Sequence, residues 1–441
     1  MFEIREKPEM VERAMLVSIY FDPSEAGEKQ AMLDQLEDLV SNLGIGIVSK
    51  HLVKSRDMHA KFLCGTGKAQ EVKQLAVDCG ADCVVFDNML APSQQREWER
   101  LIDECVIDRE EVILDIFAKR ARTREATLQV ELARMQYSLP RMARMWSHLD
   151  RQGGGSGGGK GGGGAARGEG EKQIEVDRRL ARARIEAIQK ELVMVTRQRA
   201  TQRKERERQA GATAAIVGYT NAGKSSLLSL VSGSEVMARD MLFATLDTTT
   251  RKIELPNGQP LLLTDTVGFI RNLPHRLVEA FKSTLEEAVL ADFLVQVVDA
   301  SDPEAVRHYE TTLEVLGELG AGDKPMIVVL NKLDLVPEEE RAALTERLAP
   351  HFNGSLVCMS VRERQGTEDL LRACVEMLES RVRRARFLIP YTRSDLAAAM
   401  HSEGMVISTE YVEEGALVEA VLPVAFYNKV SQFLAEPSCE E

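Results

Sequence analysis

Short apolar runs and helix-like patterns alternate along the first quarter of the chain. Residues 15–20 and Cys83-Val-Val-Phe86 are apolar runs typical of buried strands, whereas apolar residues recur every three or four positions over residues 24–43, as on one face of a helix. Strands that alternate with helices favour a parallel sheet covered by helices. We therefore predict a small α/β domain over residues 1–117.

A long helical pattern follows and is interrupted by glycine. Apolar residues recur at alternating spacings of four and three over residues 128–146, and again over residues 181–195. Glycine fills nearly all of residues 153–164, and it costs roughly 1 kcal/mol per helical position relative to alanine. Residues 118–210 are therefore predicted to form an antiparallel helical hairpin joined by a flexible glycine-rich loop.

Strand and helix patterns alternate most regularly beyond Thr213. Asn257-Gly258 lies between two strand-like runs, and this dipeptide is a strong signal for a two-residue hairpin turn. We predict a doubly wound sheet with one antiparallel hairpin over residues 211–380. Residues 385–441 leave room for a small C-terminal α/β domain, so the predicted fold class is a multidomain α/β protein.

Composition indicates a globular protein that does not span a membrane. Hydrophobic residues make up 44% of the 441 residues, but no apolar run approaches the roughly 20 residues needed to cross a bilayer, and the first residues lack a signal-peptide core. The seven cysteines show no paired, metal-finger spacing, and scattered thiols are typical of a reducing compartment. We therefore expect a cytoplasmic protein, and we expect it to be a monomer.

Charge is unevenly distributed along the chain, whose formal net charge is −13. Residues 119–151 contain eight basic and three acidic residues, and residues 177–208 contain eleven basic and five acidic residues. Two basic arms on an acidic body can hold a phosphate backbone while the rest of the protein is repelled from it. The same pattern also fits two solvated helix faces, and it is compatible with peripheral contact with a membrane.

One segment fits the phosphate-loop pattern GxxxxGK[ST] and lies between an apolar strand and a helix pattern, as this motif requires. Its residues are Gly218, Tyr219, Thr220, Asn221, Ala222, Gly223, Lys224 and Ser225. Backbone N–H groups of such a loop surround the β-phosphate at a helix N-terminus. We expect Lys224 to neutralise β and γ oxygens and the Ser225 hydroxyl to bind Mg²⁺.

A second motif, Asp265-Thr266-Val267-Gly268, ends an apolar strand further along. The Asp265 carboxylate can hold Mg²⁺ through a water molecule, and the Gly268 N–H can contact the γ-phosphate because no side chain is in the way.

A third motif, Asn331-Lys332-Leu333-Asp334, follows another apolar strand and predicts recognition of guanine. The Asp334 carboxylate can accept two hydrogen bonds from guanine N1–H and N2–H₂, which adenine does not offer, and sites built in this way reject an analogue by roughly 10⁴-fold or more. Ser360 and Val361, with Arg362, follow the next strand, where they would meet the guanine O6.

A threonine that binds Mg²⁺ and senses the γ-phosphate is still needed. Phe243-Ala244-Thr245-Leu246-Asp247 lies in the right interval, and we favour Thr245 over the three threonines at positions 248–250. Many GTPases place a glutamine directly after the aspartate motif, but here the residue is Phe269, which can neither donate nor accept a hydrogen bond. We therefore assign no catalytic side chain, and we predict slow intrinsic hydrolysis that a partner stimulates.

These segments resemble those of the HflX GTPases, a group with a hydrophobic residue in place of the catalytic glutamine. The likeness rests on residues 243–247 and 265–270, and the N-terminal part agrees through residues 90–95, 108–133 and 171–179. It covers most of residues 1–380. There are two departures: the glycine-rich loop is longer than is usual in the family, and the usual Gly-Pro-Gly-Glu-Thr-Gln is absent after it.

The resemblance implies a ribosome-associated GTPase that engages the large subunit and helps to split stalled or stress-damaged ribosomes. The two basic arms are where such a protein would hold ribosomal RNA. One alternative is a non-catalytic, GTP-dependent RNA-binding switch in ribosome assembly. Another is a tRNA-modification GTPase resembling TrmE, although the C-terminal Pro437-Ser-Cys439-Glu-Glu does not match that family's cysteine signature. Gly65-Thr-Gly67-Lys68 lacks phosphate-loop spacing and is predicted to be a turn that opens a helix.

Overall fold

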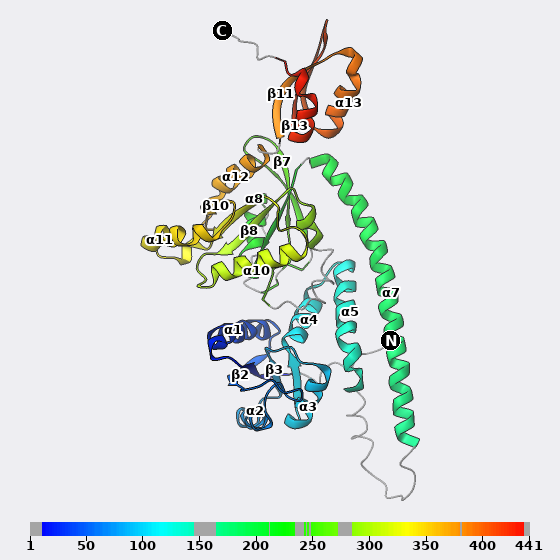
Figure 1. Cartoon of the computed structure of the whole chain (residues 1–441), viewed down its shortest axis with the longest axis vertical. Coiled ribbons are helices and arrows are strands. Elements are labelled where there is room, and N and C mark those ends of the chain that lie inside the picture. Colours follow the sequence, from blue (N-terminus) through cyan, green and yellow to red (C-terminus); the bar gives the residue numbers. More distant parts are fainter. Residues whose placement is uncertain are drawn as a thin grey trace, which may run out of the picture. The chain divides into compact units, whose positions relative to one another are not determined.

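A computed structural model gives the fold of the chain (Figure 1). It describes residues 11–144, 165–210, 212–233, 242–243, 245–246, 248–271, 285–379 and 382–435. Internal contacts divide the chain into two units. Unit 1 comprises Met1–Gln198, Arg239–Asp247 and Asn272–Ser283, and unit 2 comprises Arg199–Ala238, Thr248–Arg271 and Thr284–Glu441. The four-domain division drawn from the sequence stays a prediction.

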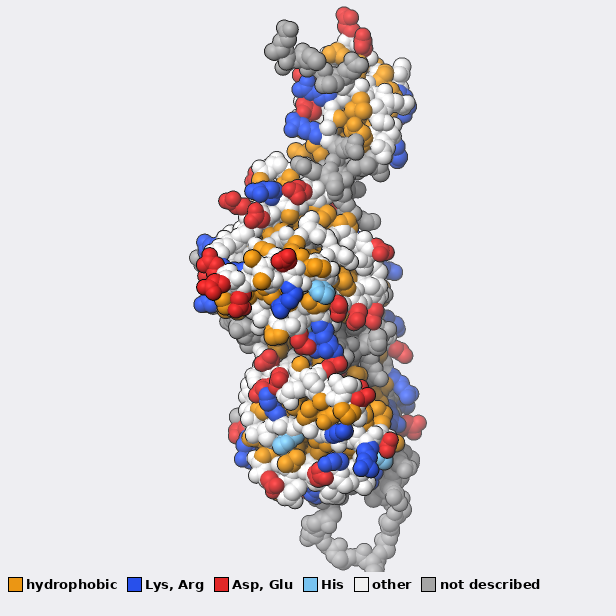
Figure 2. Space-filling model, turned by 60° about the vertical axis from the view of Figure 1, so that its left-hand side comes forward, with side chains coloured by type: hydrophobic (Ala, Val, Ile, Leu, Met, Phe, Trp, Pro, Cys, Tyr) orange, Lys and Arg blue, Asp and Glu red, His pale blue; other side chains and the backbone are white. Residues whose placement is uncertain are grey.

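The surface mixes all kinds of side chain. On the face shown in Figure 2, acidic and basic groups are interspersed, with hydrophobic groups scattered among them. Among the helices that the structure describes, none combines the length and the hydropathy needed to cross a membrane.

Unit 1 begins with a four-stranded parallel sheet in the order β2-β1-β3-β4. Its strands are β1 (Arg13–Tyr20), β2 (Gly46–Lys54), β3 (Cys83–Phe86) and β4 (Cys105–Asp108). The helices that connect and follow them are α1 (Ala26–Asn42), α2 (Thr66–Cys79), α3 (Pro92–Ile102) and α4 (Arg109–Arg120). Every residue of β3 is buried, as expected for a central strand covered by helices on both faces.

Trp98 on α3 lies at the centre of this domain's core. Its side chain is fully buried, and its ring lies 5.1 Å from the ring of Phe62 and 4.8 Å from that of Phe86. Gly65 precedes the first turn of α2, so the Gly65–Lys68 segment opens a helix, as its sequence predicts.

Two helices pair in opposite directions within unit 1, and the second of them continues beyond Gln198 into unit 2. They are α5 (Arg124–Ser138) and α7 (Ala165–Ala210), and a 3-10 turn (Leu139–Arg144) follows α5. Arg124 near the start of α5 pairs with Glu191, whereas Glu131 further along pairs with Arg184 earlier in α7, at 2.7 Å. This reversed order shows that the helices are antiparallel. The predicted glycine-rich loop lies outside the described residues.

The end of α5 is fastened to the parallel sheet by buried polar groups. The Tyr137 hydroxyl donates to the Asp108 carboxylate at 3.1 Å, and the Arg141 guanidinium donates to the Leu90 carbonyl at 2.7 Å and to the Gln95 side chain at 2.8 Å. Asp108 is completely buried, and burial raises the pKa of its carboxyl. These bonds join the helical arm to the carboxyl ends of β3 and β4.

Unit 2 contains a six-stranded sheet in the order β10-β9-β8-β5-β7-β6, parallel except for the β6–β7 hairpin. Its strands are β5 (Ala212–Gly218), β6 (Thr249–Glu254), β7 (Pro260–Asp265), β8 (Phe293–Asp299), β9 (Met326–Asn331) and β10 (Ser355–Cys358). Its helices are α8 (Lys224–Ser232), α10 (Ala305–Glu318), α11 (Glu338–Leu348) and α12 (Thr367–Glu379). Gly258 turns the hairpin with φ +79°.

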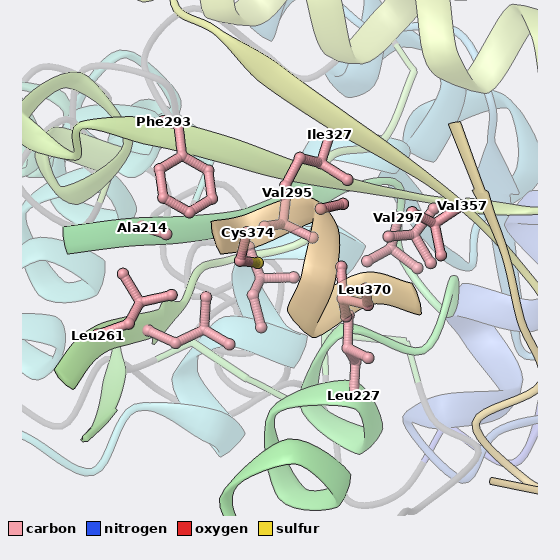
Figure 3. Packing of buried hydrophobic residues seen from close by; sticks show 14 of the residues in the cluster. Ala214, Leu227, Leu261, Phe293, Val295, Val297, Ile327, Val357, Leu370 and Cys374 are labelled. Atoms are coloured by element: carbon pink, nitrogen blue, oxygen red, sulfur yellow. The ribbon is translucent and has the colours of Figure 1, made fainter. Parts of the chain in front are cut away.

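Apolar residues from β8, β9 and α12 form the core beside this sheet. Figure 3 shows Phe293 and Val295 of β8 with Ile327 of β9, and Leu370 of α12 near Leu227 of α8. All are buried. Strand β8 reads as a nearly continuous apolar run because both of its faces are covered.

The C-terminal part of unit 2 is a three-stranded antiparallel sheet, β11-β13-β12, with two helices. Its elements are β11 (Val382–Ile389), α13 (Ser394–Glu403), β12 (Met405–Val412), β13 (Gly415–Pro423) and α14 (Val424–Val430). Short 3-10 turns elsewhere are Pro23–Glu25, Leu333–Leu335, Ala349–His351, Tyr391–Arg393 and Ser431–Phe433. The predicted fold class, multidomain α/β, is confirmed.

Candidate nucleotide-binding site

The phosphate-loop segment connects β5 to α8 at the carboxyl edge of the sheet. Two of its glycines are required by the space around them. Gly218 has φ +143°, and a Cβ there would lie 2.3 Å from the Val297 carbonyl oxygen; Gly223 has φ +99°, and a Cβ there would lie 2.3 Å from the Asn331 Nδ2. The loop can therefore approach its neighbours only because these positions carry no side chain.

Lys224 is the first residue of α8 and is almost completely buried. Its Nζ donates to the Tyr219 carbonyl at 2.6 Å. Burial lowers the pKa of Lys224 from 10.5 to about 8, while the nearby Asp265 carboxylate acts in the opposite direction. An amine kept out of water at a helix N-terminus is suited to a strongly negative ligand such as a phosphate chain.

Ser225 and Asp265 come from different elements and meet at this edge. The Ser225 hydroxyl donates to Asp265 Oδ2 at 2.7 Å, and Thr266 donates to the Ile216 carbonyl at 2.7 Å, which holds the end of β7 against β5. Hydroxyl and carboxylate oxygens are the ligand types that Mg²⁺ prefers, so these residues fit that ion. In the part of the chain that the structure describes, no group of three or more His, Cys, Asp or Glu could hold a metal ion.

Gly268 and Phe269 lie directly beside the phosphate loop. A Cβ on Gly268 would be 2.9 Å from Lys224 Nζ and 2.9 Å from Thr220 Cγ2, so only glycine fits. The Phe269 side chain is 1% exposed. Its N–H donates to the Gly218 carbonyl at 3.1 Å, and its carbonyl accepts from the Thr220 N–H at 2.8 Å. Phe269 is therefore a core residue locked against the loop.

The third motif joins the two ends of the site. Asn331 Nδ2 donates to the Ala222 carbonyl at 2.8 Å, and Asn331 Oδ1 accepts from the Val361 N–H at 3.1 Å. This one side chain thus ties the phosphate loop to the loop after β10.

The Asp334 carboxylate is held in place by that same loop. Ser360 donates its hydroxyl to Asp334 Oδ1 at 2.7 Å, and the exposed Arg362 guanidinium lies 4.0 Å from Oδ2. The structure therefore brings together Asn331, Asp334, Ser360 and Val361, as the sequence predicts. Their individual roles stay predictions.

Lys332 has a partner that the sequence reasoning missed. It adopts φ +65°, and its Nζ lies 2.8 Å from the Asp299 carboxylate at the end of β8. The sequence could have predicted this pair, because Asp299 ends an apolar strand and the carboxyl ends of neighbouring parallel strands meet at one edge of a sheet. Leu333 is buried beneath this motif.

The predicted switch threonine is not part of the unit that carries the phosphate loop. Thr245 belongs to unit 1, whereas the phosphate loop belongs to unit 2. Within unit 1, the neighbouring Phe243 and Leu246 are buried, and the Phe243 ring packs edge-on against Phe117 at 4.7 Å. Ala244 and Asp247 lie outside the described residues. The role of Thr245 as a magnesium ligand stays a prediction.

Three family models match consecutive parts of the chain. They are the GTP-binding GTPase N-terminal family over residues 30–118, the GTP-binding GTPase Middle Region over residues 120–206, and the 50S ribosome-binding GTPase family over residues 213–332.

Similar proteins extend over nearly the whole chain. A GTPase HflX of Akkermansia muciniphila is 90% identical over 99% of this chain and 100% of its own length. A GTPase HflX of Chlamydia pneumoniae is 38% identical over 98% of this chain and 90% of its own length. The chain belongs to the HflX family of GTPases. Among solved structures, a GTP-binding protein from Sulfolobus solfataricus in complex with GDP aligns with 84% of this chain and 99% of its own, at 23% identity and a TM-score of 0.42.

Membership in the HflX family confirms the resemblance inferred from the motifs. It also confirms that the protein binds and hydrolyses GTP. The sequence similarity of HflX relatives continues beyond the G domain into the C-terminal part, which the motifs alone did not cover. The family is not that of the tRNA-modification GTPases considered as an alternative.

Proposed function

We propose that this HflX GTPase binds GTP together with Mg²⁺ at the edge of the six-stranded sheet, and that it uses GTP to act on the large ribosomal subunit, helping to split or rescue ribosomes under stress. The observation that carries this proposal is the match of residues 213–332 to a family described as 50S ribosome-binding GTPases. The two basic arms support it, since RNA is the polyanion that a ribosome presents.

The phosphate chain would lie on the loop between β5 and α8. Backbone N–H groups at the start of α8 point to this position, and Lys224 supplies a positive charge that the protein shields from water. Bound Mg²⁺ would neutralise charge on the β and γ oxygens, with Ser225 as one ligand and Asp265 acting through water. The Gly268 N–H would contact the γ-phosphate, which makes this residue the part of the site that distinguishes GTP from GDP.

The guanine base would be read by Asp334. The Ser360 hydroxyl donates a 2.7 Å hydrogen bond to one oxygen of the Asp334 carboxylate, and this bond fixes the orientation of the carboxylate. Asn331 fixes the distance between the base end and the phosphate end, because it bonds to both loops.

Hydrolysis by the protein alone would be slow. Phe269 occupies the position where many GTPases place a water-orienting glutamine, and its burial prevents any approach to the nucleotide. Removing a group that stabilises the transition state costs roughly 10²- to 10³-fold in rate. We propose that the ribosome, or ordering of the segment around Thr245, supplies the missing contribution.

Single-turnover GTP hydrolysis with and without purified large subunits tests the coupling. We expect stimulation by large subunits, together with co-sedimentation that is stronger with GTP or a non-hydrolysable analogue than with GDP. Small subunits at the same concentration are the control. Splitting would then be measured as the conversion of whole ribosomes into subunits on a sucrose gradient.

A second candidate is a GTP-dependent RNA-binding switch in ribosome assembly, in which slow hydrolysis only resets the switch. The buried Phe269 favours this candidate. In that case GTP would strengthen ribosome binding, but large subunits would not accelerate hydrolysis. Binding without stimulation would therefore support the switch and contradict the coupled enzyme.

A further inference from the structure

A cluster of aromatic and charged side chains lies against the phosphate loop and belongs to none of the nucleotide motifs. It consists of Tyr219 from the loop, Arg271 from the segment after β7, and Glu304 and His308 at the start of α10. All four residues belong to unit 2. Tyr219 and Arg271 are buried, and the His308 side chain is 12% exposed.

The rings of Tyr219 and His308 are stacked. Their centroids are 3.8 Å apart and the planes differ by 10°. Imidazole and phenol faces in contact exclude water from each other and restrict the rotation of both side chains. The Tyr219 ring is thus held by α10, although Tyr219 belongs to the phosphate loop.

The Tyr219 hydroxyl has a specific task. It accepts a hydrogen bond from the Arg271 N–H at 3.0 Å. Two main-chain bonds connect the same segments: the Phe269 N–H donates to the Gly218 carbonyl, and the Thr220 N–H donates to the Phe269 carbonyl. The phosphate loop and residues 269–271 are therefore joined at three points, and one of these depends on the Tyr219 side chain.

Arg271 is fixed from the other side as well. Its guanidinium lies 2.7 Å from the Glu304 carboxylate. The carboxylates of Asp302, Glu304 and Asp299 surround His308, with Asp302 at 3.4 Å from its Nδ1, and Arg271 is the nearby cation.

The space around Gly268 makes this attachment important for the nucleotide. A Cβ on Gly268 would be only 2.9 Å from Lys224 Nζ, so no side chain fits between the Gly268 backbone and the Lys224 amine. A small displacement of residues 269–271 would move Gly268 relative to Lys224. Misplacement of a reacting or binding group by about 1 Å can cost roughly 10²-fold in rate.

We propose that Tyr219 and His308 are positioning residues for GTP hydrolysis, acting as a clamp that holds residues 268–271 against the phosphate loop. His308 keeps the Tyr219 ring in place, Tyr219 holds the Arg271 amide, and Arg271 is fastened to Glu304. This inference rests on the proposed role of Gly268 at the γ-phosphate and deepens it. Neither Tyr219 nor His308 needs to touch the nucleotide, and the clamp acts only through Gly268.

The test compares four variants of the full-length protein. Tyr219→Phe removes the hydroxyl and keeps the stack, His308→Ala removes the stack, and His308→Phe restores an aromatic face without the ring nitrogens. His351→Ala, an exposed histidine of the same unit, is the matched control. For each variant we would measure the affinities for GDP and for a non-hydrolysable GTP analogue, the single-turnover hydrolysis rate, and the thermal unfolding midpoint.

Tyr219→Phe and His308→Ala should slow hydrolysis between roughly 10- and 100-fold and weaken the GTP analogue more than GDP, because only the γ-phosphate contact is displaced. His308→Phe should recover most of the rate, and His351→Ala should behave as wild type. Wild-type rates and an unchanged GTP-to-GDP preference in both Tyr219→Phe and His308→Ala would overturn the clamp. Equal weakening of GDP and the GTP analogue would also overturn it, since that result describes a general packing role.

Failure of the underlying site would look different. If the wild-type protein showed no affinity for the GTP analogue, the proposed nucleotide site itself would be wrong. If wild-type affinity is normal and the variants change nothing, only the clamp is wrong.

Discussion

Lys224 and Asp334 illustrate how single side chains acquire their properties from their surroundings. Lys224 loses most of its hydration inside the protein, so its pKa falls to about 8, whereas a lysine in water titrates near 10.5. The Asp334 side chain is 8% exposed, and the Ser360 hydroxyl orients its carboxylate. Lys224 is therefore suited to bind a negatively charged ligand, and Asp334 is suited to accept hydrogen bonds from a ligand.

At alkaline pH, the protein should take up a proton when it binds a nucleotide. Phosphates favour the charged amine, so the pKa of Lys224 should rise when GTP binds, and affinity should be flat below pH 8. Above pH 8 it should fall by up to about tenfold per pH unit until the pKa of the complex is reached. Calorimetry at pH 9 in two buffers with different ionisation enthalpies would measure the uptake. The Lys224→Arg variant stays protonated, so its nucleotide affinity should not fall as the pH rises above 8. If its affinity falls as steeply as that of the wild type, the proton is taken up by another group.

Asp334→Asn should change the base that the site prefers. An amide in place of the carboxylate can donate to the O2 of xanthine and no longer accepts both guanine donors, so GTP affinity should fall by roughly 10⁴-fold while xanthosine triphosphate gains. Competition between labelled GDP and unlabelled xanthosine and guanosine nucleotides measures this. Ser360→Ala is the control, because it removes the orienting hydroxyl and keeps the carboxylate: it should weaken GTP without a change of base. Unchanged preference in Asp334→Asn would contradict our assignment of the guanine site.

Junctions between strands and loops define the phosphate end of the site. The carboxyl ends of β5, β7, β8 and β9 all lie at one edge, and each contributes a residue or a loop: the phosphate loop, Asp265, Asp299 and Asn331. This is where open α/β sheets bind ligands. The order of strands therefore explains why motifs that are far apart in the sequence meet.

Gly268→Ala should disrupt the junction after β7 without unfolding the sheet. The added Cβ would lie 2.9 Å from both Lys224 Nζ and Thr220 Cγ2, so the lysine must move. We expect single-turnover hydrolysis to fall by at least about tenfold. Gly317→Ala in α10, where nothing lies within 4 Å of the new Cβ, is the matched control and should raise the unfolding free energy by roughly 0.5–1 kcal/mol. Wild-type hydrolysis in Gly268→Ala would show that the lysine can adjust without loss.

The elements that the sequence predicts best are those with a strong local pattern. Strand β8 is an apolar run that only Gln296 interrupts before Asp299 ends it, and the phosphate loop has both its spacing and its strand and helix neighbours. Both could therefore be recognised from the amino-acid sequence alone. Strand β12 could not, because Met405, Ile407 and Tyr411 are exposed and the alternation of faces is lost. The stack of Tyr219 on His308 depends on how α10 packs against the loop, and no local pattern encodes that distance.

Charge at the scale of the full chain separates the two basic arms from an acidic remainder, which is the basis for the proposed ribosome contact. The structure refines which arginines are suitable. Arg184 and Arg124 are exposed but pair with glutamates of the opposite helix and support the antiparallel arrangement. Helix α7 also carries the exposed Arg179 and Arg182 and the half-buried Arg178 beside them. Contacts with RNA phosphates should therefore be tested on the latter.

Changing Arg178, Arg179 and Arg182 to glutamate should weaken ribosome binding at least about tenfold. The slope of log affinity against log salt concentration should become less steep by about 2 to 3, because each lost phosphate contact reduces this slope by roughly 0.7 to 0.9. GTP affinity should stay at the wild-type value. The measurement is co-sedimentation with large subunits over a range of salt concentrations. Arg347, Arg372 and Lys429, exposed residues of unit 2, reversed together form the control. Equal effects of the two triple variants would mean that net charge alone, and no particular surface, governs binding.

The way α5 ends has a practical consequence for anyone who dissects this protein. In an open parallel sheet, a ligand commonly binds at the carboxyl ends of the strands. In unit 1, the side chains of Tyr137 and Arg141 occupy this position. A fragment cut at residue 117 would lack these two side chains, so the Asp108 carboxylate would lose its tyrosine and arginine partners. Such a piece should be prone to aggregate, and a truncation that keeps residues up to 144 should be the better-behaved one.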